Sequence, residues 1–299
     1  MTTVPSREGG AVTLFRRARE HKICQALKIF RASNVEPILF KGWAAARYYP
    51  PERTRLLGDV DLAVRGKDFA LAQALIKSKE LNALLIDLHR EFRHLDTVPW
   101  DDIFSNSELV QTESGSIRVP RAEDHLRLLC VHWLNDGGAN RDRLWDIYYL
   151  ITNRPDSFDW SCCLDVVSPR RRRWIICTIG LTHKYLGLNI SDLPFRDEVK
   201  QIPEWVIRCV EREWKRGGHI QPLLGSFGSL RLFFDQVSRR LPPNPLRAVI
   251  EGEGDLDRRF RFDYQVRVLL RRAIPFFENT GDFFARRLRE GWIKTPDQD

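Results

Sequence analysis

The chain has 299 residues, 43% of them hydrophobic and 29% charged, which is typical of a soluble globular protein with room for two domains. No apolar run is long enough for a membrane-spanning helix, and the opening residues lack the basic-then-apolar pattern of an export signal. We therefore expect a cytoplasmic protein with no membrane partner. The net charge of +8 favours an anionic partner, either a nucleotide, a polynucleotide or an acidic protein, and does not choose among them.

The six cysteines follow no disulfide or metal-binding spacing. No pair is separated by two residues, and Cys162 and Cys163 are adjacent. We therefore expect reduced, mostly buried thiols. The run Arg170–Arg173 is typical of a solvated helix face, with a nucleic-acid site as the alternative.

In the first 120 residues, short apolar runs alternate with helical patterns. An amphipathic helix is expected over 11–33, with apolar residues recurring at helical spacing. Strands are expected within 35–42, 59–64, 82–92 and 116–120, and helices within 43–49 and 67–80. The first of these two helices should end at Pro50, because proline cannot continue it. In the second, Phe69, Leu71, Ala74 and Leu75 are expected to face inward.

The pattern changes after Pro120 and becomes mostly helical. Strong helices are expected over 122–136, ending at Gly137-Gly138, and over 141–152. We predict an α+β protein in which a small domain of sheet and helices over 1–120 precedes a helical domain over 121–299.

Two aspartates lie in the apolar stretch LLGDVDLAV, over 56–64. Side chains alternate across a strand, so Asp59 and Asp61 share one face while Val60 and Leu62 share the other. Adjacent carboxylates repel and are costly to bury unless a positive charge holds them. A divalent cation does this well, and Mg²⁺ prefers such hard oxygen ligands together with substrate phosphate.

The next expected strand carries Asp87 within another apolar run, with His89 on the same face. If the two strands are neighbours, Asp87 completes a cluster of three carboxylates that can hold Mg²⁺. Asp59 and Asp61 would then share ions, and Asp87 would bind the catalytic ion and help deprotonate an acceptor. His89 could orient a carboxylate, contact phosphate or assist proton transfer.

A lysine and a glycine, Lys41 and Gly42, follow the first expected strand and precede a helix. Glycine in that position lets backbone N–H groups approach a phosphate closely, and the lysine adds a positive charge. Isolated pairs of this kind are common. Together with the aspartates downstream, the pair indicates a phosphate-binding loop.

These segments resemble the uncharacterised nucleotidyltransferase family of the polymerase-β-like superfamily, over about residues 35–150. The resemblance is carried by Lys41-Gly42, by Tyr49-Pro50, by Arg55 with Gly58-Asp59-Val60-Asp61, and by Asp87-Leu88-His89. Downstream, His132 and Asp146 also match. The two lie on consecutive expected helices and could form a hydrogen-bonded pair beneath the site.

The resemblance implies a nucleotidyltransferase fold, in which a short mixed sheet is flanked by helices. It implies Mg²⁺, or alternatively Mn²⁺, on Asp59, Asp61 and Asp87. It also implies a nucleoside triphosphate bound through Lys41, Gly42, Arg55, Gly58 and His89. Arg55 could instead form a salt bridge to Glu52 or to an aspartate of the site.

We therefore expect an enzyme that moves a nucleoside monophosphate to a hydroxyl or phosphate of a peptide, protein or small molecule and releases pyrophosphate. A toxin that modifies tRNA and a kinase that moves the γ-phosphate are alternatives. A further alternative is a module that binds nucleotide without catalysis. Its support is Trp43, which follows Gly42 where the wider superfamily has a small residue.

Overall fold

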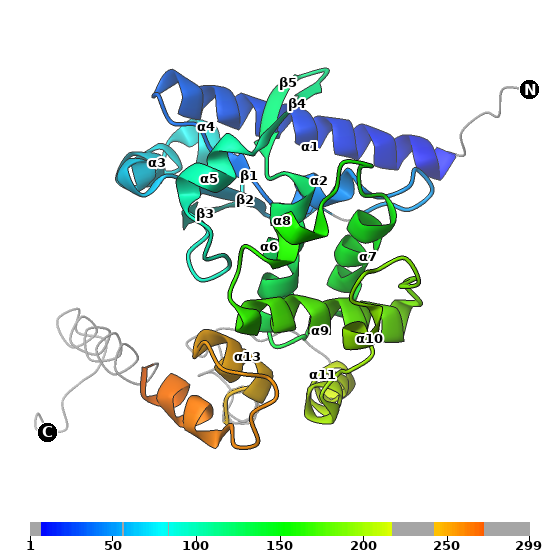
Figure 1. Ribbon diagram of the computed structural model, residues 1–299. Coiled ribbons are helices and arrows are strands. Elements are labelled where there is room, and N and C mark those ends of the chain that lie inside the picture. The colour runs from blue at the N-terminus through cyan, green and yellow to red at the C-terminus, as the bar shows by residue number, and fades with distance from the viewer. Residues whose placement is uncertain (1–6, 56, 83, 217–241, 272–299) are drawn as a thin grey trace, which may run out of the picture. The chain divides into compact units, whose positions relative to one another are not determined.

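The computed structural model describes residues 7–55, 57–82, 84–216 and 242–271, with side chains from residue 16 onward. By its internal contacts the chain forms two units, one over 1–134 and 140–202, the other over 135–139 and 203–299. The combination of short strands with many helices confirms the α+β class (Figure 1). The first unit extends past residue 120, and the domain boundary expected there stays a prediction.

The first unit carries the strands. Its strands are β1 (Ile38–Leu39), β2 (Val60–Val64), β3 (Ile86–Arg90), β4 (Glu108–Thr112) and β5 (Gly115–Val119). Its longer helices are α1 (Arg7–Ala32), α3 (Phe69–Leu75), α6 (Ala122–Asn135), α7 (Leu144–Thr152) and α9 (Pro169–Leu186). Its short helices are α2 (Gly42–Ala46), η1 (Gly66–Asp68), α4 (Lys79–Asn82), α5 (Trp100–Ser105), η2 (Arg141–Arg143), α8 (Trp160–Leu164) and α10 (Arg196–Val199).

A three-stranded mixed sheet has the order β1-β2-β3. Strand β1 pairs antiparallel with β2, and β2 pairs parallel with β3. In the parallel pair, Asp61 is directly opposite Asp87. Strands β4 and β5 form a separate antiparallel hairpin. Strand β4 was not predicted, because its sequence ELVQT has little apolar alternation and its side chains are mostly exposed.

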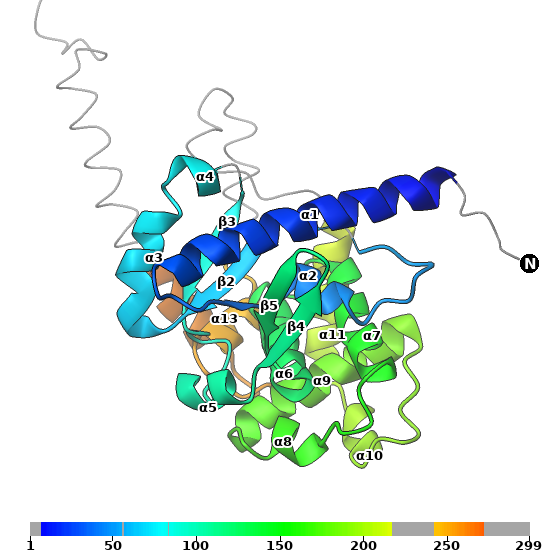
Figure 2. The same cartoon turned by 90° about the horizontal axis from the view of Figure 1, so that it is seen from above.

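The hydrophobic core lies between this sheet and α1. All five residues of β2 are buried, because both faces of the strand are covered. Ile23, Leu27 and Phe30 of α1 pack in one cluster with Leu62 and Val64. Figure 2 shows α1 running alongside the hairpin and the sheet. The apolar spacing of α1 thus covers the sheet that holds the aspartates.

Two helix predictions need correction. Helix α2 ends at Ala46, where turns take the chain on to Pro50, so it is shorter than expected. In α3, Leu71 is 47% exposed and Ala74 is also exposed, whereas Ala72 is buried. The 3₁₀ turn of η1 immediately before α3 places the helix in a different phase from the one that apolar spacing suggested.

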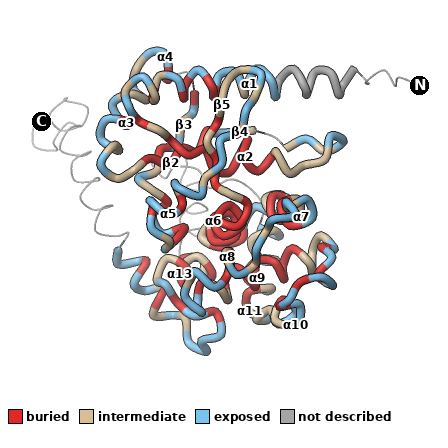
Figure 3. Tube along the Cα trace, turned by 45° about the horizontal axis from the view of Figure 1, so that its top comes forward, coloured by how far each residue is buried: buried red, intermediate tan, exposed pale blue. Residues whose placement is uncertain are grey.

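Helix α6 is buried along almost its whole length (Figure 3). Its Arg127 is 1% exposed and pairs with Asp96 and Asp124 at 2.9 and 2.6 Å. Arg127 also donates to the carbonyl of Cys162. This buried ion cluster joins α6 to the segment after β3 and to α8, because each polar atom of the arginine side chain bonds to one of them or within α6.

The arginine run at the start of α9 is largely structural. Arg171 is buried and donates to the carbonyls of His94 and Leu95. Arg172 pairs with Glu198, and Arg173 donates to the carbonyl of Gln201. The expectation of a solvated face is therefore wrong for Arg171, whereas Arg170 is exposed and Arg172 and Arg173 are half-buried.

The second unit is helical in its described part, with α11 (Glu204–Arg216), α13 (Pro245–Glu251) and a helix over 262–271. Asn244 caps α13 by accepting from the backbone N–H of Arg247. In neither unit does any described helix combine the length and apolar character needed to cross a membrane. All six cysteines are free thiols, five of them buried.

Candidate functional site

The central feature of the site is the pairing of Asp61 on β2 with Asp87 on β3. Residues in register on neighbouring parallel strands project to the same side of the sheet, and His89 follows on that side two residues later. Ligand atoms of Asp61, Asp87 and His89 all lie within 4.8 Å of one another. Asp61 is 4% exposed, whereas Asp87 is exposed. The two strands are neighbours, as assumed in the prediction, and their pairing brings together Asp61 and Asp87, two of the three expected carboxylates.

His89 bridges the two carboxylates. Its Nε2 lies 3.0 Å from Oδ2 of Asp87 and 3.7 Å from Oδ1 of Asp61. Burial alone would lower the pKa of His89, but its hydrogen bonds to Asp61 and Asp87 outweigh burial and raise that pKa. The hydrogen bond from His89 lowers the pKa of Asp87. Asp87 is therefore ionised at neutral pH.

Lys41 supplies the positive charge beside Asp61. Its ammonium contacts Oδ1 of Asp61 and lies 3.0 Å from Nε2 of His132. Lys41 is only 8% exposed and has a positive φ of 63°, which is uncommon for a residue with a side chain. The turn between β1 and α2 thus directs a buried lysine toward the aspartate.

His125 supports this turn from α6. It is fully buried, and its Nε2 accepts the backbone N–H of Lys41 at 3.4 Å. Burial lowers the pKa of His125 to about 3, with help from the charges of Arg47 and Arg55. The imidazole is therefore neutral when the protein is folded at neutral pH.

We expect the low pKa of His125 to make folding pH-dependent. Below its ordinary pKa of 6.5, the unfolded chain binds a proton at this residue that the folded chain does not. The free energy of unfolding should therefore fall as the pH drops from 6.5 toward 3, by up to about 1.4 kcal/mol per pH unit. In urea denaturation, His125→Gln should show a shallower pH dependence than the wild type. Parallel curves would contradict this.

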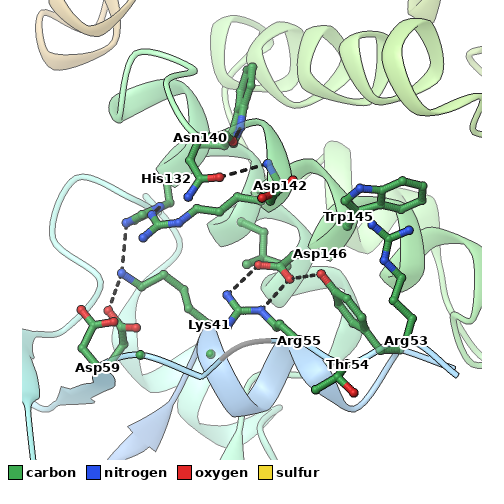
Figure 4. Close-up of a pocket in the computed structure, with 17 residues that line it drawn as sticks. Lys41, Arg53, Thr54, Arg55, Asp59, His132, Asn140, Asp142, Trp145 and Asp146 are labelled. Carbon is green, nitrogen blue, oxygen red and sulfur yellow. Dashed lines mark hydrogen bonds and ion pairs between the residues drawn. The ribbon is translucent and has the colours of Figure 1, made fainter. Parts of the chain in front are cut away.

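A cavity of about 460 Å³ opens beside the aspartates and is shown in Figure 4. Its walls come from the segment between β1 and β2, from α6 and from the start of α7. Six of the predicted site residues line it: Lys41, Gly42, Arg55, Gly58, Asp59 and Asp61. Asp87 and His89 adjoin it through Asp61. A cavity of this size is in the range of small-molecule sites.

Asp59 differs from Asp61 in its setting. It is exposed and precedes the first residue of β2, and it lines the cavity outside the close group of Asp61, Asp87 and His89. Gly58 next to it is also exposed, and its carbonyl accepts from Arg19 of α1. The two aspartates thus share the cavity, with one buried and one at its mouth.

Arg55 is fixed by a partner other than the expected ones. Its Nε and Nη2 donate to the two carboxylate oxygens of Asp146, at 2.7 and 2.8 Å. The same carboxylate accepts from the hydroxyl of Tyr49 at 2.7 Å. Burial, together with this carboxylate, raises the pKa of Tyr49. Asp146 therefore holds the guanidinium plane of Arg55 at the cavity wall.

His132 lies among cationic side chains of the cavity. It lies against Lys41 and, at 3.3 Å, against Nη1 of Arg143, while Asp146 lies against Arg55 and Tyr49. Burial and these two cationic neighbours lower the pKa of His132 well below its usual value. A neutral imidazole therefore lies next to the lysine.

Trp43 does not line the cavity. Its ring is 5% exposed and belongs to the core cluster of the sheet and α1. Its indole N–H donates to Glu20 of α1 at 3.1 Å. Trp43 is thus a packing residue of the core.

Several cavity residues were missed from the sequence, namely Arg53, Thr54, Asn140, Asp142, Arg143 and Trp145. Arg53 and Thr54 lie in the segment between α2 and β2, and Asn140 precedes η2. The other three lie in η2 and α7, where the pattern indicated only a helix. The signal that could have found them is the concentration of arginine and tryptophan just before Asp146, a residue that the family resemblance had already marked.

The chain matches a known protein family. The model of the family described as uncharacterised nucleotidyltransferase matches residues 15–187, more than half of the chain. The protein is thus a transferase of the nucleotidyltransferase class. It belongs to that uncharacterised family, as the sequence motifs indicated.

No curated protein matches the chain. Among solved structures, an antigenic nucleotidyltransferase-like protein from Paracoccidioides brasiliensis is similar, at 13% sequence identity and a TM-score of 0.37. The match covers 62% of this chain and 94% of that one.

Proposed function

We propose that this protein transfers a nucleoside monophosphate from a nucleoside triphosphate to an acceptor hydroxyl or phosphate and releases pyrophosphate. The observation that carries this proposal is the register of β2 and β3, which sets Asp61 opposite Asp87 beside a cavity lined with cationic side chains. Family membership supports nucleotidyl transfer in general. The metal, the acceptor and the leaving group belong to the proposal.

The donor set fits a divalent cation. Asp61 and Asp87 supply the hard oxygen ligands that Mg²⁺ and Mn²⁺ prefer, and Asp59 offers a third carboxylate on the same cavity. When bound, the metal would neutralise phosphate charge and activate the attacking oxygen. The contact of Lys41 with Asp61 supports the fit, because a cation already lies beside this buried carboxylate.

The cationic side chains that line the cavity can bind the phosphate groups of the triphosphate. The ammonium of Lys41 lies between Asp61 and His132 and can contact a phosphate oxygen as a point charge. Arg55 is held in one plane by Asp146, which suits it to phosphate oxygens that need fixed directions. Gly42 and Gly58 line the same wall and leave room for the phosphates. His89 orients Asp87 through its hydrogen bond.

The acceptor that we favour is a peptide, a protein or a small molecule. A tRNA remains an outcome of the experiment. The burial of Trp43 in the core removes the observation that had supported a non-catalytic module. Triphosphates labelled in the α- or the γ-phosphate distinguish transfer of a nucleoside monophosphate from transfer of the γ-phosphate.

The test uses ATP, GTP, CTP and UTP radiolabelled in the α-phosphate. Each is incubated with the purified protein, Mg²⁺ and one of three acceptor pools, namely total tRNA, a protein and peptide fraction, or a small-molecule fraction of a cell extract. We expect α-label to enter one pool. Label transferred only from γ-labelled triphosphate would indicate a kinase, and no transfer of either label would contradict the proposal.

Metal removal is a separate prediction. Excess EDTA should abolish transfer of the α-label, because Asp61 and Asp87 alone would repel the triphosphate. Addition of Mg²⁺ beyond the chelator should restore it, and Mn²⁺ should substitute. Transfer that continues unchanged in EDTA would contradict a metal at these aspartates.

A further inference from the structure

We infer that Arg53 and Trp145 form a base-stacking platform on which the nucleobase of the triphosphate lies. This inference rests on the proposed function and adds the part of the site that binds the base. Both residues line the cavity that contains Lys41 and Asp61. Figure 4 shows Arg53 and Trp145 at one side of it and Lys41 with Asp59 at the other.

Further aromatic rings pack beside the platform, and the centre of the Tyr149 ring lies 5.7 Å from the guanidinium carbon of Arg53. The guanidinium carbon of Arg53 lies 3.5 Å from the centre of the Trp145 ring. Trp145 stacks on Tyr149 with ring centres 5.5 Å apart and planes 25° apart. Tyr149 in turn contacts Tyr49 at 4.6 Å, and the Tyr49 hydroxyl is fixed by Asp146. The same carboxylate thus fixes both Arg55 and the aromatic stack.

The charge of Arg53 is available for a ligand. Other arginines that lie over rings also pair with acids, as Arg47 does with Glu108 and Arg118 with Glu36. Within the described part of the chain, no carboxylate lies within ion-pair distance of Arg53. Its neighbour Arg55 is held by Asp146 instead. Arg53 therefore keeps hydrogen-bond donors for a molecule in the cavity.

A nucleobase fits this platform better than a phosphate does. A phosphate is bound by the edges of a guanidinium group, whereas here the flat face of Arg53 is presented on an aromatic ring. Planar bases stack on arginine and aromatic faces, and every base has such a face. We therefore expect all four triphosphates to bind, with the purines binding more tightly because their rings are larger.

The experiment compares the binding of ATP with that of inorganic tripolyphosphate, which has the phosphates without the base. Dissociation constants are measured by calorimetry with Mg²⁺ for the wild type, Arg53→Lys, Trp145→Phe and Trp145→Ala. Arg53→Lys keeps the charge and removes the plane. The matched control is Arg47→Lys, since Arg47 lies 5.3 Å over the Tyr48 ring and does not line the cavity.

In Arg53→Lys and Trp145→Ala, we expect ATP to bind about 10-fold more weakly, while the affinity for tripolyphosphate is nearly unchanged. Trp145→Phe should lose less, and Arg47→Lys should behave as wild type. If Trp145→Ala does not fold, Arg53→Lys and Trp145→Phe still decide the result.

Weakening of both ligands to the same degree, or of neither, would overturn the platform. The platform would also be overturned if the wild type bound ATP no more tightly than tripolyphosphate. If the expected difference is found but no label is transferred to any acceptor, the platform stands and the proposed transfer fails. A wild type that binds neither ligand would overturn both.

Discussion

Replacing Asp61 by asparagine is expected to reduce nucleotidyl transfer about 1000-fold or more, mainly through kcat. The substitution keeps the shape of the side chain and removes the buried negative charge that faces Asp87, His89 and Lys41. The metal would then lose a carboxylate ligand at the point where β2 borders the cavity, and the triphosphate would lose the metal that helps to hold it. The measurement is the rate of α-label transfer at saturating triphosphate.

The matched control for this substitution is Asp101→Asn on α5. Asp101 is exposed, pairs with Arg65 and lies outside the cavity. Its transfer rate should equal that of the wild type. Melting temperatures of both variants show whether they fold. A folded Asp61→Asn protein that retains most of its activity would exclude Asp61 as a metal ligand.

The largest effect on stability is expected from Arg127→Met, at about 3–5 kcal/mol of the free energy of unfolding. Arg127 is 1% exposed, and removing its charge leaves Asp96 and Asp124 buried without their main partner. The pKa of Asp124 is already raised, since burial outweighs its two arginine partners, which shows how costly this charge is to bury. Urea denaturation at neutral pH measures the loss.

The comparison for Arg127 is Arg17→Met. Arg17 pairs with Glu113 on the surface, where their side chains are 65% and 75% exposed. Water and salt screen such pairs, so this variant should change stability by less than about 1 kcal/mol. Equal effects of the two substitutions would mean that the buried ion cluster contributes little to stability.

The core of the site could be predicted from the sequence because its signals are local. Strand alternation relates Asp59 to Asp61 and Asp87 to His89, and an apolar run that contains carboxylates predicts a buried strand beside a metal. The sheet adds that β2 and β3 are parallel and in register. The pairing of these two strands is a tertiary contact, so from the sequence alone it could only be assumed.

The cavity walls could not be predicted in the same way. Arg55 and Asp146 are 91 residues apart in the chain, and no local pattern relates them. Arg53 and Trp145 meet through the same long-range packing of the segment before β2 against α7. The phase of α3 and the exposed strand β4 were missed for other reasons. In α3, six of the seven residues are apolar, so spacing alone does not mark one buried face, whereas β4 has few apolar residues.

The register of β2 and β3 separates the two carboxylates of the proposed metal site from the walls of the cavity. The spacing of Asp61 and Asp87 is set by backbone hydrogen bonds, and a slip of one residue would place Leu88 beside Asp61 and turn Asp87 to the other face. Substitutions in the loops and in α7 can therefore reshape the cavity without moving the two carboxylates. Under the proposed function, such a division would allow substrate preference to diverge during evolution while the metal ligands stay constant.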